Sequence, residues 1–120
     1  SPAEALTKIG AQLVEELADI ETIFVLTQSG KTARYASSFR PRRDLFAFTD
    51  DENTARKLQL LWGTESILVD FDTENPEVTI DAAKKLFLSK HPQKKGTKFL
   101  LLSGSLVNGK FVPMVQVREL

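Results

Sequence analysis

The segment TQSGKT, residues 27–32, carries the side chains of this 120-residue chain that are best suited to chemistry. It ends in the Gly-Lys-Thr of a nucleotide-binding P-loop, and it follows an apolar run that is typical of a strand. A P-loop also needs a glycine five positions before the second one, because there the loop wraps the phosphates. That position is Val25 in this chain, so the sequence argues against a triphosphate site.

The same segment retains what a single phosphate group requires. Its hydroxyl groups, the N–H groups at the start of a helix, the charge of Lys31 and the small Gly30 together form a cradle for one anion. In the alternative interpretation, Ser29 only caps the helix and binds nothing. The candidate phosphate-binding residues are Thr27, Gln28, Ser29, Gly30, Lys31 and Thr32.

Two acidic segments follow later strands, and neither has the spacing of a metal or phosphotransfer site. In TDDENT, residues 49–54, the acids are best explained as first-turn residues that stabilise a helix dipole. DFDTE, residues 70–74, resembles the D-x-D-x-T motif of haloacid-dehalogenase-like enzymes, but Thr73 comes one residue too early. We therefore expect acidic loops, no metal site and no catalytic residue.

Three other features have a structural and a functional interpretation. His91, the one histidine, lies in a lysine-rich turn, where we expect an exposed residue rather than a metal ligand or part of a catalytic triad. Trp62 precedes a glycine and is expected in the core or in an interface. The cluster of Arg40, Arg42 and Arg43 is a solvated turn or, alternatively, a contact with an anion or another subunit.

Composition limits the class of protein. A hydrophobic content of 42% in 120 residues predicts a single globular domain, residues 1–120, with one core. Sixteen basic and sixteen acidic residues cancel, which argues against a surface for nucleic acid or for an anionic membrane. The chain has no cysteine, no apolar run long enough to span a bilayer and no visible signal peptide, so a cytoplasmic protein, or a piece of one, is expected.

The elements that must position these residues alternate between helices and strands. An amphipathic helix is predicted over residues 6–17, a second between Gly30 and Pro41, a third around residues 55–61 that ends at Gly63, and a fourth over residues 78–88. Strands are predicted over residues 23–26, 45–48, 67–69, 99–102 and 111–117.

This alternation predicts an α/β fold with a mostly parallel sheet. The last strand follows only the loop of residues 103–110, so it is expected to pair antiparallel at an edge. Ligands of such sheets bind beyond the carboxyl ends of the parallel strands. Four loops lie there, at residues 27–32, 49–54, 70–77 and 103–110.

Taken together, these motifs resemble the C-terminal domain of pyruvate kinase. The run VLTQSGKTARYASSFRPRRDLFAFTDDENTARKLQLLWGTESILV, residues 25–69, has the VLT-x-SG-x-T-A start, an Arg-Pro turn, TAR-x-L-x-L and a glycine after an aromatic residue. KKG, an apolar strand and an SG-containing loop follow in the same order. The resemblance implies a three-layer α/β/α sandwich with four parallel strands and one antiparallel strand.

The resemblance also implies a regulatory role. The catalytic barrel of the family, with its magnesium and potassium sites, has no counterpart here, so the domain would carry no cofactor and no catalysis of its own. Its expected partners are a phosphorylated sugar or nucleotide monophosphate effector, its own barrel domain and further copies in a homotetramer. By resemblance, residues 27–32 hold the effector phosphate, and the lid over it comprises Ser103, Gly104, Ser105, Asn108, Gly109 and Lys110.

Several departures from the family pattern bear on the effector. Lys31 stands where an arginine is common; it keeps the charge but loses the bidentate fork. Residues 72–79 lack the Trp and Arg that members using fructose 1,6-bisphosphate often have, and NGKFVPMV replaces a G-T-T-N-like run. A monophosphorylated sugar, a nucleotide monophosphate or phosphate itself therefore fits at least as well as a bisphosphate. A small independent enzyme, a structural oligomerisation module and a stand-alone relative of the domain stay open as alternatives.

Overall fold

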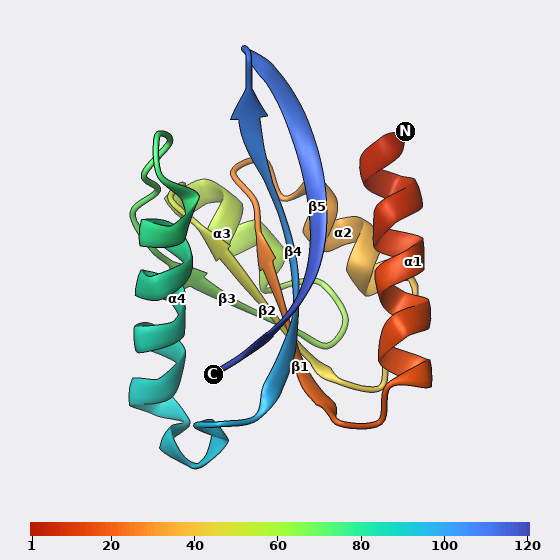
Figure 1. Cartoon of the computed structure of the whole chain (residues 1–120). Helices are drawn as coiled ribbons and strands as arrows, with labels where there is room; N and C mark the ends of the chain where they lie inside the picture. Colours follow the sequence, from red (N-terminus) through yellow and green to blue (C-terminus); the bar gives the residue numbers. More distant parts are fainter.

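The chain folds into a five-stranded sheet that lies between layers of helices (Figure 1). The computed structural model describes the backbone of residues 1–120 and all side chains except those of residues 105–107. The helices are α1 (Pro2–Glu16), α2 (Lys31–Ser38), α3 (Glu52–Leu58), α4 (Pro76–Lys90) and the short 3-10 helix η1 (Pro92–Lys94). The strands are β1 (Ile20–Leu26), β2 (Asp44–Thr49), β3 (Thr64–Leu68), β4 (Lys98–Val107) and β5 (Lys110–Glu119).

The strands lie in the order β3-β2-β1-β4-β5. Strand β1 pairs in parallel with β2 and β4, β2 pairs in parallel with β3, and β5 pairs antiparallel with β4. Each parallel connection passes through a helix, so the carboxyl ends of the four parallel strands lie along one edge of the sheet. This topology confirms the predicted three-layer α/β/α sandwich with a mostly parallel sheet and an antiparallel last strand.

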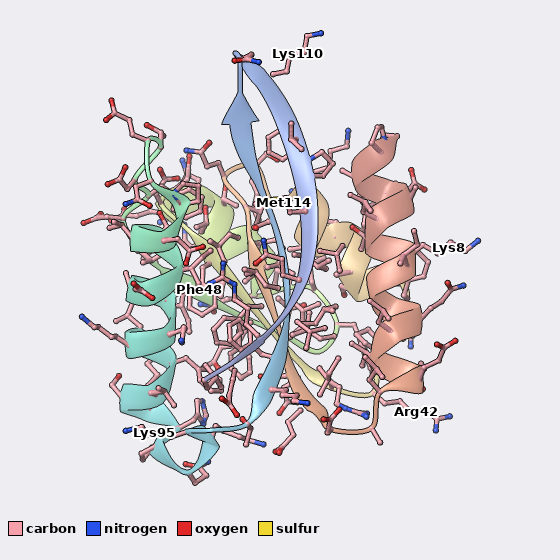
Figure 2. All side chains as sticks on the ribbon, in the orientation of Figure 1. Lys8, Arg42, Phe48, Lys95, Lys110 and Met114 are labelled. Carbon is pink, nitrogen blue, oxygen red and sulfur yellow. The ribbon has the colours of Figure 1, made fainter. Side chains whose placement is uncertain are left out.

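Each face of the sheet has its own hydrophobic core. On one face, side chains of β1, β2 and β4 pack against α1, α2 and Leu58 of α3. On the other face, phenylalanines of the strands, including Phe48 in Figure 2, pack against α4. The fully buried Phe24 lies in this second core, with its ring centroid 4.5 Å from that of Phe99 and 5.1 Å from that of Phe87. The central strand is therefore held on both faces.

The helix boundaries follow from local caps more than from the apolar pattern. Helix α1 begins at Pro2, four residues before its first leucine, because the Ser1 side chain accepts a hydrogen bond from the N–H of Glu4 and proline suits the first helical position. Helix α3 ends at Leu58, before the turn that contains Gly63 at φ 62°. Within the part of the chain that the structure describes, no helix combines the length and hydropathy needed to cross a membrane.

The prediction of a loop over residues 103–110 is wrong. Strand β4 continues to Val107 and β5 starts at Lys110, so that only two residues turn between them. These residues, Asn108 at φ 51° and Gly109 at φ 76°, have the left-handed backbone of a tight hairpin turn. The apolar pattern missed the pairing because hydrogen bonds between strands, rather than burial, extend this hairpin beyond the rest of the sheet (Figure 1).

One predicted side-chain environment is corrected and another is narrowed. The predicted exposed His91 caps the end of α4, half-buried, with its ring 4.8 Å from that of Phe87 and 5.6 Å from that of Phe46. Of the two places predicted for Trp62, the structure removes the core, because the residue is 51% exposed, and the interface stays a prediction. The Arg40 guanidinium lies 5.5 Å from the centre of the Trp62 ring. His91 is partly covered because Phe46 of β2 and Phe87 of α4 lie beside its ring, a contact that the sequence alone does not show.

Candidate functional site

The loop between β1 and α2 is shaped by its own first residue. The hydroxyl of Thr27, a residue only 7% exposed, accepts a hydrogen bond of 2.9 Å from the N–H of Gly30. The N–H of Thr27 donates to the carbonyl of Phe48 in the neighbouring strand at 2.9 Å. The Thr27 hydroxyl thus helps to set the position of the helix start, and its predicted contact with a ligand stays a prediction.

Gly30 is the N-cap of α2 and has a left-handed backbone, at φ 87°. A Cβ atom at this position would lie 3.1 Å from Cδ2 of Leu58 and 3.3 Å from Cγ2 of Thr54. Glycine is therefore required by both the backbone and the packing of α3 against the loop. Glycine has no side chain that could cap the helix from this position, so the positive end of the α2 dipole stays open.

The groups left available at this helix start are those that bind an anion. Among the described residues, the N–H groups of Thr32 and Ala33 donate to no acceptor. The Ser29 hydroxyl accepts from the N–H of Lys31 at 3.3 Å, as the capping interpretation predicts, and keeps its own proton for a ligand. Ser29 and Lys31 are exposed. The loop therefore offers two backbone donors and a hydroxyl at the helix start. The ammonium group of Lys31 lies 5.9 Å from the centre of the Tyr35 ring, so it would have to turn toward the helix start to contact the same ligand.

Hydrogen bonds to the next loop hold this arrangement in place. The carbonyl of Gln28 accepts from the Thr54 hydroxyl at 3.0 Å and from the Thr49 hydroxyl at 3.5 Å. The Gln28 side-chain amide donates to the Asp50 carboxylate at 3.2 Å. The two loops at the carboxyl ends of β1 and β2 are thus tied together at Gln28, so the cradle is formed before any ligand arrives.

The acidic segments form a helix N-cap and an exposed loop, as the sequence predicts. Asp51 is the N-cap of α3, and its carboxylate accepts from the N–H of Thr54 at 3.1 Å. Asp72 lies in an exposed loop, where its carboxylate accepts from the N–H groups of Glu74 and Asn75 at 3.0 and 2.9 Å. Among the described side chains, no group of three or more His, Asp and Glu residues is arranged to hold a metal ion.

A pocket of about 180 Å³ lies beside the cradle, between the end of β1, the start of α4 and the β4–β5 hairpin. Gln28 lines the pocket and also belongs to residues 27–32, so the pocket adjoins the candidate phosphate-binding loop. Its lining comprises Leu26, Gln28, Phe71, Asp72, Thr73, Pro76, Thr79, Ile80, Ser103, Gly104 and Phe111.

The predicted lid residues divide into two groups. Ser103 and Gly104 line the pocket, and Ser103 also shares a cavity of about 10 Å³ with Thr32 of the cradle. Asn108, Gly109 and Lys110 lie instead at the hairpin tip and line none of these cavities; Figure 2 shows Lys110 at its far end. The side chain of Ser105 lies outside the described residues. The structure thus brings the base of the hairpin, not its tip, to the candidate site.

The residue that covers the pocket from the hairpin is Phe111. Its ring lies across Gly104, where a Cβ atom would collide with Cζ and Cε2 of the phenylalanine. An aromatic ring over a cross-strand glycine is a known way to fill the gap that glycine leaves in a sheet. Phe111 is nevertheless 61% exposed. Sequence reasoning treated it only as the start of a strand. The Asn-Gly turn before it was the signal that could have set the hairpin register, in which Gly104 pairs with Pro113 and Phe111 lies diagonally across from the glycine.

An ion pair fixes the margin of the pocket next to α4. Arg118 of β5 donates through two of its nitrogens to the carboxylate of Glu77 in the first turn of α4. These hydrogen bonds lower the pKa of Glu77. Because Glu77 follows the pocket-lining Pro76, the bidentate pair ties the edge strand to the helix that forms the pocket wall.

Comparison with known proteins agrees with this geometry. The family model described as pyruvate kinase, alpha/beta domain, matches residues 4–115. Pyruvate kinase 2 of Synechocystis sp. is 32% identical over 102 residues, which are 85% of this chain and 17% of the relative. Pyruvate kinase of Lactococcus lactis subsp. lactis is 36% identical over 92 residues, 74% of this chain and 18% of the relative.

A solved structure supports the fold independently. Cryptosporidium parvum pyruvate kinase in complex with ADP matches with a TM-score of 0.87 at 20% sequence identity, over 99% of this chain and 24% of the other. At 20% identity, this match supports the fold alone. The chain spans less than a quarter of the length of each of these three proteins.

Proposed function

The chain belongs to the pyruvate kinase α/β domain family, and from this membership we propose that it is the regulatory domain of such an enzyme and binds a phosphorylated effector. The observation that carries the proposal is the open N-terminus of α2. There the N–H groups of Thr32 and Ala33 and the Ser29 hydroxyl lie beside a pocket that would take the rest of a ligand. Lys31, whose ammonium lies over the Tyr35 ring, adds its charge when its side chain turns toward the phosphate.

The charges around the pocket favour an effector with one phosphate group. Among its described lining residues there is no lysine or arginine, whereas Asp72 supplies a carboxylate. A second phosphate in the pocket would meet this like charge in a partly apolar setting, where repulsion is strong. A monophosphate avoids the repulsion because its one anionic group stays in the cradle.

In the longer enzyme, we expect catalysis to reside in a separate barrel domain with its own magnesium and potassium ions. The domain described here would not by itself catalyse the reaction of phosphoenolpyruvate with ADP. The effector would change turnover only if it bound two arrangements of the subunits with different affinities. Equal affinities would leave the equilibrium between the two arrangements unchanged. A cytoplasmic location, expected from the sequence, stays a prediction.

Calorimetry on the chain tests effector binding. Titration with ribose 5-phosphate, glucose 6-phosphate, AMP and fructose 1,6-bisphosphate is expected to give binding of at least one monophosphate. Lys31→Ala should weaken that binding about tenfold, because a lost hydrogen bond to a charged group costs about 1.5 kcal/mol. Lys57→Ala on α3, an exposed lysine outside the cradle, is the matched control and should change nothing. Absence of heat from all four compounds would refute the proposal.

The edge strand β5 favours a second role, in subunit contact. It is the last strand of the sheet and exposes Phe111, Val112 and Val117, with Val117 43% accessible. Unpaired edge strands with apolar side chains are typical surfaces for pairing with another chain. We propose that a second copy of the chain covers this edge, as one contact of a homotetramer in the longer enzyme.

Sedimentation equilibrium tests the contact. The wild-type chain should sediment as a dimer or larger, and Val117→Glu should shift it to the monomer, because a charge at an apolar contact is desolvated without a partner. Val78→Glu is the control: Val78 is similarly exposed but lies on α4, away from the edge. A wild-type chain that stays monomeric at high concentration would remove the oligomerisation role.

A further inference from the structure

The sheet has a second free edge, at strand β3 on the side opposite to β5. The N–H of Val69 donates to the carbonyl of Thr49 at the end of β2. Residues two apart in a strand direct their backbone groups to the same side, so Ile67 also faces β2, whereas Ser66 and Leu68 face outward. In the described part of the chain, the backbone groups of these two outward-facing residues have no hydrogen-bond partner. Strand β3 therefore offers the donors and acceptors that a further strand would need.

Strand β3 lacks the features that usually protect an edge from pairing. Such edges carry a proline, a lysine or a bulge. The sequence of β3 is TESIL, and its ladder with β2 runs in register without a bulge. The Ser66 hydroxyl donates to the carbonyl of Ala55 at 2.6 Å, so this side chain points back to α3 and does not cover the edge.

Two hollows lie along this edge, and Leu68 lines both of them. The larger, of about 470 Å³, lies between the loop after β2, the end of β3 and α4. The smaller, of about 280 Å³, lies between β3 and α3. Leu68 is 46% exposed, and Leu86 of α4, which lines the larger hollow, is 37% exposed. Apolar side chains of an added strand would remove these two leucines from water, which is favourable.

The rim of the two hollows is negatively charged. Its carboxylates belong to Asp50, Glu52 and Asp70. Among the described lining residues, Arg56 is the one basic side chain, and its guanidinium donates to the side chain of Asn53. Pairing of two copies of the chain through this edge would bring like charges together. Charge complementarity therefore favours a basic partner over a second copy.

We propose that an extended basic segment of a partner protein adds to β3 as a further strand of the sheet. Hydrogen bonds with the backbone of Ser66 and Leu68 supply affinity, as they do in other cases of strand addition. The apolar side chains of the segment cover Leu68 and Leu86, and its lysine or arginine side chains pair with the carboxylates at the rim. Because the site lies at the edge opposite to β5, it leaves the subunit contact proposed for β5 free.

Amide hydrogen exchange of the isotope-labelled chain, followed by NMR, tests the inference with the end-capped peptide KVKVKVK as the probe. In the free chain, the N–H groups of Ser66 and Leu68 should exchange rapidly and those of Ile67 and Val69 slowly, because only the latter face β2. Saturating peptide should slow exchange at Ser66 and Leu68 about tenfold or more and leave the other two unchanged. The peptide EVEVEVE should bind about tenfold more weakly, because it meets like charges.

A pair of variants tests the contact with the leucine. Leu68→Lys should weaken KVKVKVK binding about tenfold, because an apolar contact is replaced by a charge that repels the peptide. Val78→Lys on α4 is the matched control: Val78 is 49% exposed and lines neither hollow, so the same added charge should leave the affinity unchanged. Both positions are exposed, and circular dichroism shows whether each variant is folded.

Three results would overturn the inference. One is rapid exchange at Ser66 and Leu68 that persists with saturating peptide. Another is an equal loss of peptide affinity in the Leu68→Lys and Val78→Lys variants. The third is slow exchange at Ser66 and Leu68 in the chain alone, because it would show that a second copy already covers the edge.

Discussion

Ser29→Glu will abolish effector binding, raising the dissociation constant about a hundredfold or more, the effect of several kcal/mol of repulsion between like charges. The introduced carboxylate lies at the start of α2 and takes the N–H groups of Thr32 and Ala33 that a phosphate would use. It also stabilises the helix dipole, so the domain should fold normally. Calorimetric titration with the best-bound monophosphate measures the loss.

Ser38→Glu is the matched control for this change. Ser38 is also exposed and belongs to the same helix, but it lies at the opposite end, where its hydroxyl donates to the carbonyl of Tyr35. The Ser38→Glu variant carries the same added charge away from the cradle. Its affinity for the monophosphate should stay within about twofold of wild type, since screened charges more than a Debye length apart interact little. Equal losses in both variants would mean that net charge, not the cradle, governs binding.

Phe24→Ala will lower the free energy of unfolding by about 3–5 kcal/mol, as other large-to-small changes of buried phenylalanines do. Phe24 is 0% exposed and its ring contacts those of Phe48, Phe87 and Phe99, with centroids 4.5 to 5.1 Å away. Removing it leaves a cavity between the sheet and α4 that rigid neighbouring rings cannot fill. Urea unfolding, with the midpoint and slope compared to wild type, measures the loss.

Phe111→Ala is the control for this prediction, because the same side chain is removed from a surface position, 61% exposed. Its cost should stay below about 1 kcal/mol, as for most surface substitutions. A similar loss in the two variants would show that the aromatic cluster against α4 is not the main source of stability.

The sequence predicted the fold class because the local signals agreed with the tertiary structure. The run at residues 23–26 is continuous and apolar, and the structure buries it on both faces as the central strand. Gly30 and Pro41 bounded a helix, and α2 lies between them. The hairpin could not be predicted in this way, because residues 103–110 are held by pairing between strands, which leaves no apolar pattern.

The candidate site was predicted in part. The position of residues 27–32 followed from the rule that ligands bind beyond the carboxyl ends of parallel strands, and the structure places the loop there. The use of the Thr27 hydroxyl inside the loop and the pairing of Phe71 with Phe111 in one pocket were missed. Both depend on residues that come together only through the fold.

The most direct test of the phosphate cradle is a titration of the isotope-labelled chain with ribose 5-phosphate, followed by two-dimensional amide NMR spectra. The account predicts that the amide signals of Lys31, Thr32 and Ala33 move in a saturable manner, because their N–H groups lie at the open start of α2. Unchanged signals at these three residues, or saturable changes confined to the arginine cluster at residues 40–43, would contradict it.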